Sequence, residues 1–294
     1  MALPFVEIRN RRQHETSPQT VLFLMSLAAT DLAPTRLALG ISYRGKAYHG
    51  WQSQADGQTV QDRVERALST FADRAVRTVC AGRTDTGVHA LNQVIHIDPA
   101  VHRKLFSWVR GTNRFLPDDI AVQWCHAVDA DFHARFSALG RRYSYLVRES
   151  VARPALESGM VGWVCRPLEA DLMRRAAQVL IGEHDFSAFR SSECQAASPV
   201  KHVRAIEIHR RGAYWRFDFD ASAYLHHMVR NIMGCLLAVG SQTRSAGWLA
   251  EVLAARDRHA AAPTFPADGL YFVGPYYDQR HAIPDRMLTQ DWLP

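Results

Sequence analysis

Strand-like and helix-like stretches alternate twice along the chain, and this order limits the folds that the sequence can adopt. In the first half, strands are predicted at residues 36–43, 76–80, 93–97 and 121–125, and helices at 59–71 and 101–113. In the second half, strands are predicted at 143–147, 203–208, 214–219 and 270–273, and helices at 170–181, 225–239 and 247–255. Two comparable runs of mixed elements favour an α+β fold in which helices cover one face of a sheet.

The length and composition are those of a globular protein. A chain of 294 residues can form one large domain or two of ordinary size. Its 47% hydrophobic and 22% charged residues exclude a disordered chain, and no apolar run approaches the ~20 residues of a membrane span. We predict an α/β half at residues 36–130, a second half at 131–283 and a tail at 284–294.

Residues 1–35 do not fit this pattern, and we predict that they form a disordered extension. The basic residues 9–12 are separated by a polar gap from the apolar residues 21–29, which distinguishes the segment from a secretory signal. Met25 is an alternative start, so the first 24 residues are interpreted as an upstream extension. Five cysteines without a C-x-x-C pair indicate free thiols in a reducing compartment, and we expect a cytoplasmic protein.

A short polar loop between two strand-like runs is the first candidate for chemistry. It reads Cys80-Ala81-Gly82-Arg83-Thr84-Asp85-Thr86-Gly87-Val88-His89-Ala90. Glycine tolerates positive φ, so Gly82 and Gly87 can hold a side chain out at a tight turn. Loops held by rigid strands often carry catalytic groups. A plain hairpin, in which Asp85 caps its own turn and Arg83 is solvated, explains the loop alone equally well.

Arginines gather in two places in the second half of the chain. One group is Arg141, Arg142 and Arg148, and the other is Arg204, Arg210, Arg211 and Arg216, extended by Lys201 and His202. Neutralisation of phosphate charges by basic side chains supplies most of the nonspecific affinity of a protein for RNA. These groups therefore predict a surface that is lined by RNA phosphates when RNA binds. The net charge of +6 adds only weak support.

Five motifs, in order along the chain, resemble the tRNA pseudouridine synthase A family. They are Tyr48-His49-Gly50-Trp51-Gln52, the Gly82–His89 loop, Asp131-Phe132-His133-Ala134-Arg135-Phe136-Ser137, Arg141-Arg142-Tyr143-Ser144-Tyr145 and His226-His227-Met228-Val229-Arg230-Asn231-Ile232. The resemblance extends from about Arg36 to about Tyr277. It implies the pseudouridine synthase fold, with two similar α/β halves whose antiparallel sheets join around a central RNA-binding cleft.

The resemblance also implies roles for individual residues. Asp85 corresponds to the catalytic residue, which could either attack C1′ of the ribose or remove its C2′ proton. Arg83 corresponds to an RNA-contacting residue that helps to displace the base. Arg230 corresponds to an arginine that keeps the aspartate ionised, and a lone arginine on an apolar helix needs such a partner in any case. Tyr143 corresponds to the residue that packs on the target base, although Tyr145 is predicted on the same side of the strand.

The activity implied is that of an isomerase, an intramolecular transferase that converts uridine to pseudouridine in tRNA. The positions implied are 38, 39 and 40 of the anticodon stem-loop, and the reaction uses no cofactor. Family members usually act as homodimers in which one subunit binds RNA that the other modifies, so we expect a homodimer with tRNA as its partner and no membrane association.

Two other functions are consistent with parts of the sequence. A noncatalytic RNA-binding protein could keep the same surface without the chemistry, although the presence of Arg83, Asp85, Tyr143 and Arg230 argues against it. A metal-dependent hydrolase could use Asp85 with His89, His226 or His227. The chain lacks an H-E-x-x-H motif and the isomerisation needs no metal, so we expect no metal site. We interpret His89 and His133 as residues that fix loops.

Overall fold

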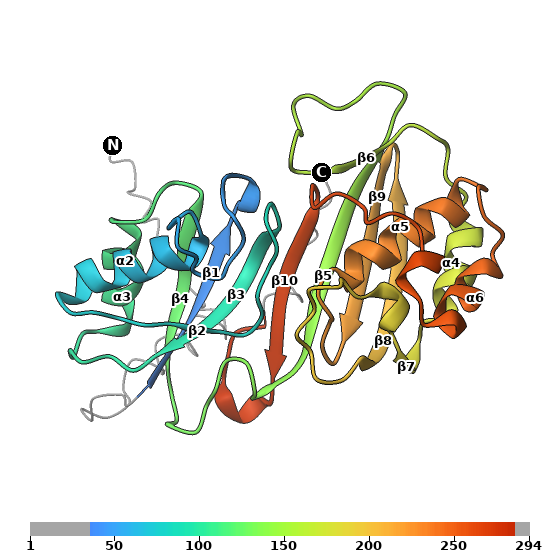
Figure 1. Cartoon of the computed structure of the whole chain (residues 1–294). Coiled ribbons are helices and arrows are strands. Elements are labelled where there is room, and N and C mark those ends of the chain that lie inside the picture. Colours follow the sequence, from blue (N-terminus) through green and yellow to red (C-terminus); the bar gives the residue numbers. More distant parts are fainter. Residues whose placement is uncertain (1–35, 286–294) are drawn as a thin grey trace, which may run out of the picture. The chain divides into compact units, whose positions relative to one another are not determined.

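A large mixed β-sheet organises residues 36–285, which are the residues that the computed structural model describes (Figure 1). The predicted extension 1–35 and all but two residues of the predicted tail lie outside them. The strand order is β4 (Ile120–Val128), β1 (Arg36–Tyr43), β3 (His89–Ile97), β10 (Leu270–Tyr277), β5 (Ala138–Glu149), β9 (Tyr214–Ala221), β8 (Val200–Arg211) and β7 (Gly182–Asp185). Two short strands lie off this path: β2 (Val79–Cys80) pairs with β3, and β6 (Gly162–Val164) pairs with β5.

Strand β10, near the end of the chain, joins the strands of the two halves. It pairs antiparallel with β5 and parallel with β3 (Figure 1). Since β3 and β5 therefore run in opposite directions, a strand between them must be parallel to one of the two. The predicted α+β class with a joined sheet is confirmed. The strands of the first half are joined through the parallel pairing of β10 with β3.

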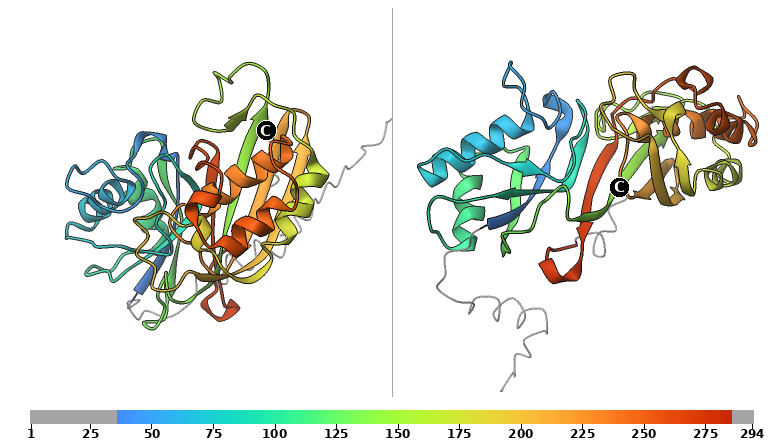
Figure 2. Two further views of the ribbon diagram at one scale, coloured as in Figure 1. Left: turned by 45° about the vertical axis from the view of Figure 1, so that its right-hand side comes forward. Right: turned by 60° about the horizontal axis from the view of Figure 1, so that its bottom comes forward.

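Five α-helices pack on one face of this sheet within the described residues. They are α2 (Val60–Ala72), α3 (Leu105–Asn113), α4 (Ala170–Gln178), α5 (Met228–Gly240) and α6 (Trp248–Ala255), with short 3₁₀ turns at Gly45–Ala47, Ser187–Phe189, Arg258–Ala260 and Gln279–His281. One core lies between β1, β3 and α2–α3, and a second lies between β5, β8, β9 and α4–α6. Both views of Figure 2 show the two groups of helices beside these strands. Tyr143 packs against both cores, so it marks the place where they meet.

Helix α2 shows why the sequence pattern predicted its element well. Thr59 caps the first turn by accepting a hydrogen bond from the backbone N–H of Asp62, and Val60, Val64 and Leu68 are buried at helical spacing. The helix ends where Asp73 adopts a left-handed conformation with φ 54°.

The strand predicted at residues 76–80 shortens to Val79–Cys80. Side chains of α2 accept its backbone hydrogen bonds instead: Val76 N–H donates to Ser69 Oγ at 2.9 Å, and Thr78 N–H donates to the Glu65 carboxylate at 2.9 Å. A backbone group that is satisfied by a side chain has no need of a neighbouring strand. Strands β6 and β7 were not predicted, because they are short and half-polar.

No helix within residues 36–285 has both the length and the apolar character needed to cross a membrane. All five cysteines lie in this range, and none forms a disulfide.

Candidate active site

The loop that carries Asp85 is held by contacts on both sides. The N–H of Val88 donates to the carbonyl of Asp85 at 3.1 Å, and Gly87 closes this turn with φ +82°, which a side chain would strain. The Gln93 amide bonds to both backbone groups of Gly82. The Tyr43 hydroxyl lies 2.8 Å from Thr84 Oγ1. The loop is therefore a rigid support for the Asp85 carboxylate.

A second segment, from the Tyr48–Gln52 motif, packs directly against this loop. Trp51 N–H donates to the carbonyl of Thr84 at 3.0 Å. Gly50 allows the approach: its φ is +84°, and a Cβ placed there would lie 2.6 Å from the same Thr84 oxygen. Only glycine fits this contact without moving the residue next to Asp85.

We expect Gly50→Ala to displace the catalytic loop. Left-handed strain and the clash together predict a loss of about 2–4 kcal/mol in the free energy of unfolding, and roughly tenfold lower kcat/KM. The matched control is Gly57→Ala, because Gly57 has φ +64° but no atom within 4 Å of the place that a methyl group would occupy. It should lose only about 1 kcal/mol and keep its activity. Equal effects of the two changes in thermal denaturation and activity assays would contradict a specific role for the contact at Thr84.

Three side chains around the start of α5 surround the Asp85 carboxylate. Arg230 Nη1 lies 3.3 Å from Oδ2, His227 Nε2 lies 3.3 Å from Oδ2, and His226 Nε2 lies 3.4 Å from Oδ1. Arg230 is held in place because its Nε also donates to the carbonyl of Phe265 at 3.0 Å. The N-terminal end of a helix favours an anion, so α5 adds to the attraction.

The backbone at the start of α5 is shaped to present this group. His227 occupies the cap position with φ 63° and ψ 3°, a left-handed conformation that is uncommon for histidine. Its carbonyl accepts the first helical hydrogen bond from Asn231 N–H at 2.9 Å, and Ser191 N–H donates to the carbonyl of His226 at 2.9 Å. Strained backbone that is fixed by its surroundings is typical of functional sites.

Electrostatics keep Asp85 ionised. Burial favours the neutral acid, but the hydrogen bond from His226 and the charges of His227, His226 and Arg230 outweigh it and lower the pKa of Asp85 below its usual 3.8. The hydrogen bond to Asp85 raises the pKa of His226 above 6.5. Burial lowers the pKa of His227 below 6.5, with repulsion from Arg230 adding to it. His226 is therefore the ring that takes up a proton first as the pH falls.

The two histidines are site residues to which the sequence assigned no role in the isomerisation. The four-residue spacing in the sequence places His226 one helical turn before Arg230 and on the same helix face. It does not give the distance between either histidine and Asp85. One carboxylate and two imidazoles form a group that could hold a metal ion within residues 36–285. Arg230 already contacts the same carboxylate, and its charge opposes a second cation. The absence of a metal site stays a prediction.

The structure separates the two candidate tyrosines. The Tyr143 ring is half-buried and packs against Tyr224 at 5.1 Å and Phe272 at 5.0 Å between ring centroids. Burial, followed by the Asp85 charge, raises the pKa of Tyr143, which is therefore neutral beside the carboxylate. The Tyr145 ring is fully buried, and its hydroxyl donates to the carbonyl of Pro266. Tyr145 is therefore a core residue, whereas Tyr143 stays partly accessible, and its contact with the base stays a prediction.

Arg83 is exposed, and within residues 36–285 it has no hydrogen-bond or ion-pair partner. It lies on the Asp85 loop, and no contact with Asp85 is present. The RNA contact that the resemblance implies for Arg83 stays a prediction.

The pairing of the clustered arginines differs from what was expected of a surface that binds RNA phosphates. Most are paired with carboxylates. Arg142–Asp220, Arg204–Asp220 and Arg216–Asp218 pair within a strand or between neighbouring strands, whereas Arg148 pairs with Glu157 of a turn and Arg210 of β8 pairs with Glu149 of β5. Cross-strand neighbours of opposite charge satisfy one another, which a count of arginines along the sequence does not reveal. Arg141 instead donates to the carbonyls of Ala81 and Ser222, and so links the segment before Asp85 to the segment after β9.

The rings of His89 and His133, which were predicted to fix loops, bond to nearby backbone groups. His89 Nδ1 accepts from the N–H of Gly45 at 3.1 Å, and its Nε2 lies 2.7 Å from the carbonyl of Gly159. His133 Nδ1 accepts from the N–H groups of Arg135 and Phe136, both at 3.2 Å. Neither ring is grouped with Asp85, so the hydrolase interpretation loses one of its proposed ligands.

Most of this chain is similar in sequence to known proteins. The sequence model of the tRNA pseudouridine synthase family matches residues 41–137 and 176–278. A tRNA pseudouridine synthase A of Methylibium petroleiphilum is 72% identical over 259 residues, which is 88% of this chain and 100% of the relative. Another, of Polaromonas naphthalenivorans, is 61% identical over 263 residues, again 88% of this chain and 100% of the relative. A solved Cbf5-Nop10-Gar1 complex is only remotely similar, with 12% identity and a TM-score of 0.32 over 68% of this chain and 45% of that chain. The chain therefore belongs to the tRNA pseudouridine synthase family and is an enzyme of the isomerase class.

Proposed function

We propose that this enzyme isomerises uridine to pseudouridine at positions 38, 39 and 40 of the tRNA anticodon stem-loop, with Asp85 as its catalytic residue. The observation that carries the proposal is the Asp85 carboxylate, partly buried, kept ionised and contacted by Arg230, His226 and His227. The named relatives, which match over their full length, supply the tRNA substrate class.

The reaction requires a carboxylate next to the ribose. The C1′–N1 bond breaks, the base turns, C5 joins C1′ and the hydrogen of C5 leaves to water. Asp85 would either attack C1′ to form a covalent intermediate or take the C2′ proton to form a glycal. In both routes the carboxylate must be ionised, and the lowered pKa of Asp85 provides this at neutral pH.

The neighbouring side chains supply the other requirements. A uridine must leave its stack before the enzyme reaches its sugar, which costs a few kcal/mol. The half-buried ring of Tyr143 would pack on the displaced base, and the unpaired Arg83 would contact the RNA and help the displacement. Arg230 would keep Asp85 ionised and oriented through its second contact with Phe265.

The deciding experiment measures tritium release from an unmodified anticodon stem-loop labelled at uridine C5, without added metal. Three further RNAs, each with uridine at only one of positions 38, 39 and 40, test each position separately. Release from all three supports the full assignment, and release from none overturns it. Full activity that is abolished by a chelator would instead favour the metal-dependent alternative at Asp85, His226 and His227.

Tyrosine variants test which ring meets the RNA. Tyr143→Ala should weaken stem-loop binding or turnover by roughly tenfold or more, because stacking contributes about 1–3 kcal/mol per base, whereas Tyr143→Phe keeps the ring and should bind normally. Tyr145→Phe is the matched control, since it loses only a buried hydrogen bond. It should lower the free energy of unfolding by about 1 kcal/mol and leave RNA binding unchanged. Unchanged binding by Tyr143→Ala in filter-binding titrations would exclude Tyr143 as the base contact.

We also propose a cytoplasmic homodimer built from subunits with two α/β halves, at 36–130 and 131–283. The resemblance of the five ordered motifs to a family whose members usually act as homodimers supports this proposal. Sedimentation equilibrium of the full chain tests the dimer, and a single species at the 33.2 kDa monomer mass would contradict it.

A further inference from the structure

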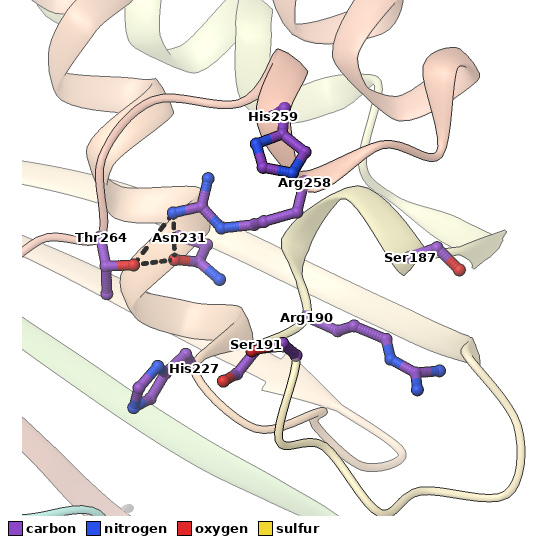
Figure 3. A pocket seen from close by; sticks show the side chains of 9 residues that line it. Ser187, Arg190, Ser191, His227, Asn231, Arg258, His259 and Thr264 are labelled. Atoms are coloured by element: carbon purple, nitrogen blue, oxygen red, sulfur yellow. Dashed lines mark hydrogen bonds between the residues drawn. The ribbon is translucent and has the colours of Figure 1, made fainter.

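A polar pocket of about 510 Å³ adjoins the Asp85 site. Its walls are formed by the turn after β7, the start of α5 and the segment around the Arg258–Ala260 turn (Figure 3). Figure 3 shows Arg258 and His259 on one side of the pocket and Ser191 and His227 on the other. His227 also contacts Asp85 at 3.3 Å, so the pocket begins one side chain away from the proposed catalytic group.

The walls of this pocket carry positive charge and hydroxyl groups. Two arginines, two histidines, three serines and one threonine are among the lining residues, and no carboxylate is. This composition differs from that of the open sheet surface, where arginines are matched by acids. Apart from His227, which contacts Asp85, the charged donors of the pocket could meet an anion without displacing an ion-paired carboxylate among residues 36–285.

The Arg258 guanidinium is fixed in the pocket wall by neutral acceptors alone. It donates to Asn231 Oδ1 at 3.1 Å, Thr264 Oγ1 at 3.0 Å and the carbonyl of Ala262 at 3.0 Å. Asn231 is in turn fixed, because its amide donates to the carbonyl of Phe189 at 2.8 Å. The charge of Arg258 is thus held rigidly, half-buried, and without an ion pair among the described residues.

Arg190 also lines the pocket, but it is held by fewer contacts. Its guanidinium donates to the carbonyl of Cys194 at 3.3 Å and forms no ion pair within the part of the chain that the structure describes. The hydrogen bond from Ser187 is the largest cause of the lowered pKa of Asp185, to which the charge of Arg190 also contributes, and Asp185 forms its ion pair with Arg256 at 3.6 Å. The Asp257 carboxylate accepts from the N–H of His259 at 2.9 Å, so it too is engaged outside the pocket.

We propose that this pocket binds a phosphodiester group of the RNA strand, next to the nucleotide that reaches Asp85. The inference rests on the proposed function only in placing an RNA strand at Asp85. Two guanidinium groups without acidic partners and several hydroxyls match the charge and the acceptor oxygens of a phosphodiester. A contact here would fix the register of the strand, so that the neighbouring uridine faces the carboxylate.

The test compares equilibrium binding of an anticodon stem-loop by charge-neutralised variants at several KCl concentrations. Arg190→Gln should bind about tenfold more weakly at low salt, and the slope of log K against log [KCl] should fall by roughly 0.7 to 1, as expected for one lost phosphate contact. Arg258→Gln, whose amide can still donate to Asn231, should act in the same way. The matched control is Arg175→Gln on the exposed side of α4, which removes the same charge and should change neither quantity.

A neutral phosphate identifies the contact. A methylphosphonate placed singly along the stem-loop should weaken binding by the wild type at one position beside the target uridine, and the same RNA should bind Arg190→Gln without further loss. Equal losses in both proteins at every position, or a salt slope unchanged in Arg190→Gln, would overturn the proposal. Competition by inorganic phosphate without any position-specific effect would assign the pocket to free phosphate instead. These readouts do not depend on turnover, so they stay informative even if Asp85 proves not to be catalytic.

Discussion

Asp85→Asn should abolish tritium release from the C5-labelled stem-loop while leaving RNA binding intact. Asparagine keeps the size and shape of the side chain but can neither attack C1′ nor accept the C2′ proton. Loss of such a group costs roughly 10²-fold or more in rate. Binding should not weaken, because removal of the carboxylate leaves Arg230, His226 and His227 free to attract the RNA backbone.

Two measurements make this prediction decisive. Stem-loop affinity, measured for the wild type and Asp85→Asn under the same salt conditions, separates lost chemistry from lost binding. The pH dependence of unfolding, compared between the wild type and Asp85→Asn, separates lost chemistry from lost structure. Because the folded-state pKa of Asp85 is lowered, its ionised form stabilises the wild-type fold above about pH 4. This contribution disappears as the pH falls through the lowered pKa. A rate within tenfold of wild type would remove Asp85 from the chemistry.

Arg230→Gln should have the second largest effect. The change removes the cation 3.3 Å from Asp85 Oδ2 but lets the amide donate to the carbonyl of Phe265. Loss of one partner of a largely buried pair predicts roughly 3 kcal/mol lower free energy of unfolding, moderated by the two histidines that remain. We expect kcat/KM to fall by about 10²-fold at neutral pH, because the carboxylate loses its fixed orientation.

The pH profile shows whether Arg230 acts through Asp85. In the wild type the acid limb of kcat/KM should lie below about pH 4, because the pKa of Asp85 is lowered. Without Arg230 one of the charges that lower the pKa of Asp85 is lost, so the acid limb should move to higher pH. Arg230→Lys keeps the charge and should retain a limb close to that of the wild type. If Arg230→Gln lowers the rate but leaves the limb in place, Arg230 acts by a route other than the ionisation of Asp85.

Local signals in the sequence determined the elements and the chemistry-bearing loop. The capping pair at Thr59 and Asp62 and the spacing of Val60, Val64 and Leu68 predict α2 because helix formation depends on neighbours three and four residues apart. Two glycines around Asp85 predict a tight turn for the same local reason, and Gly87 does adopt positive φ. The ordered motifs then indicated the family, to which the full-length relatives also belong.

Only the tertiary structure decided which groups meet at Asp85 and which arginines are free of acidic partners. His226 and His227 lie more than 140 residues from Asp85 in the sequence, and no local pattern encodes a contact that depends on the packing of α5 beside a loop from the other half. Clustering along the sequence pointed to arginines that carboxylates neutralise, whereas Arg190 and Arg258, 68 residues apart in the sequence, line one pocket. Charge acts through space, so its partners are fixed by the fold and not by spacing along the chain.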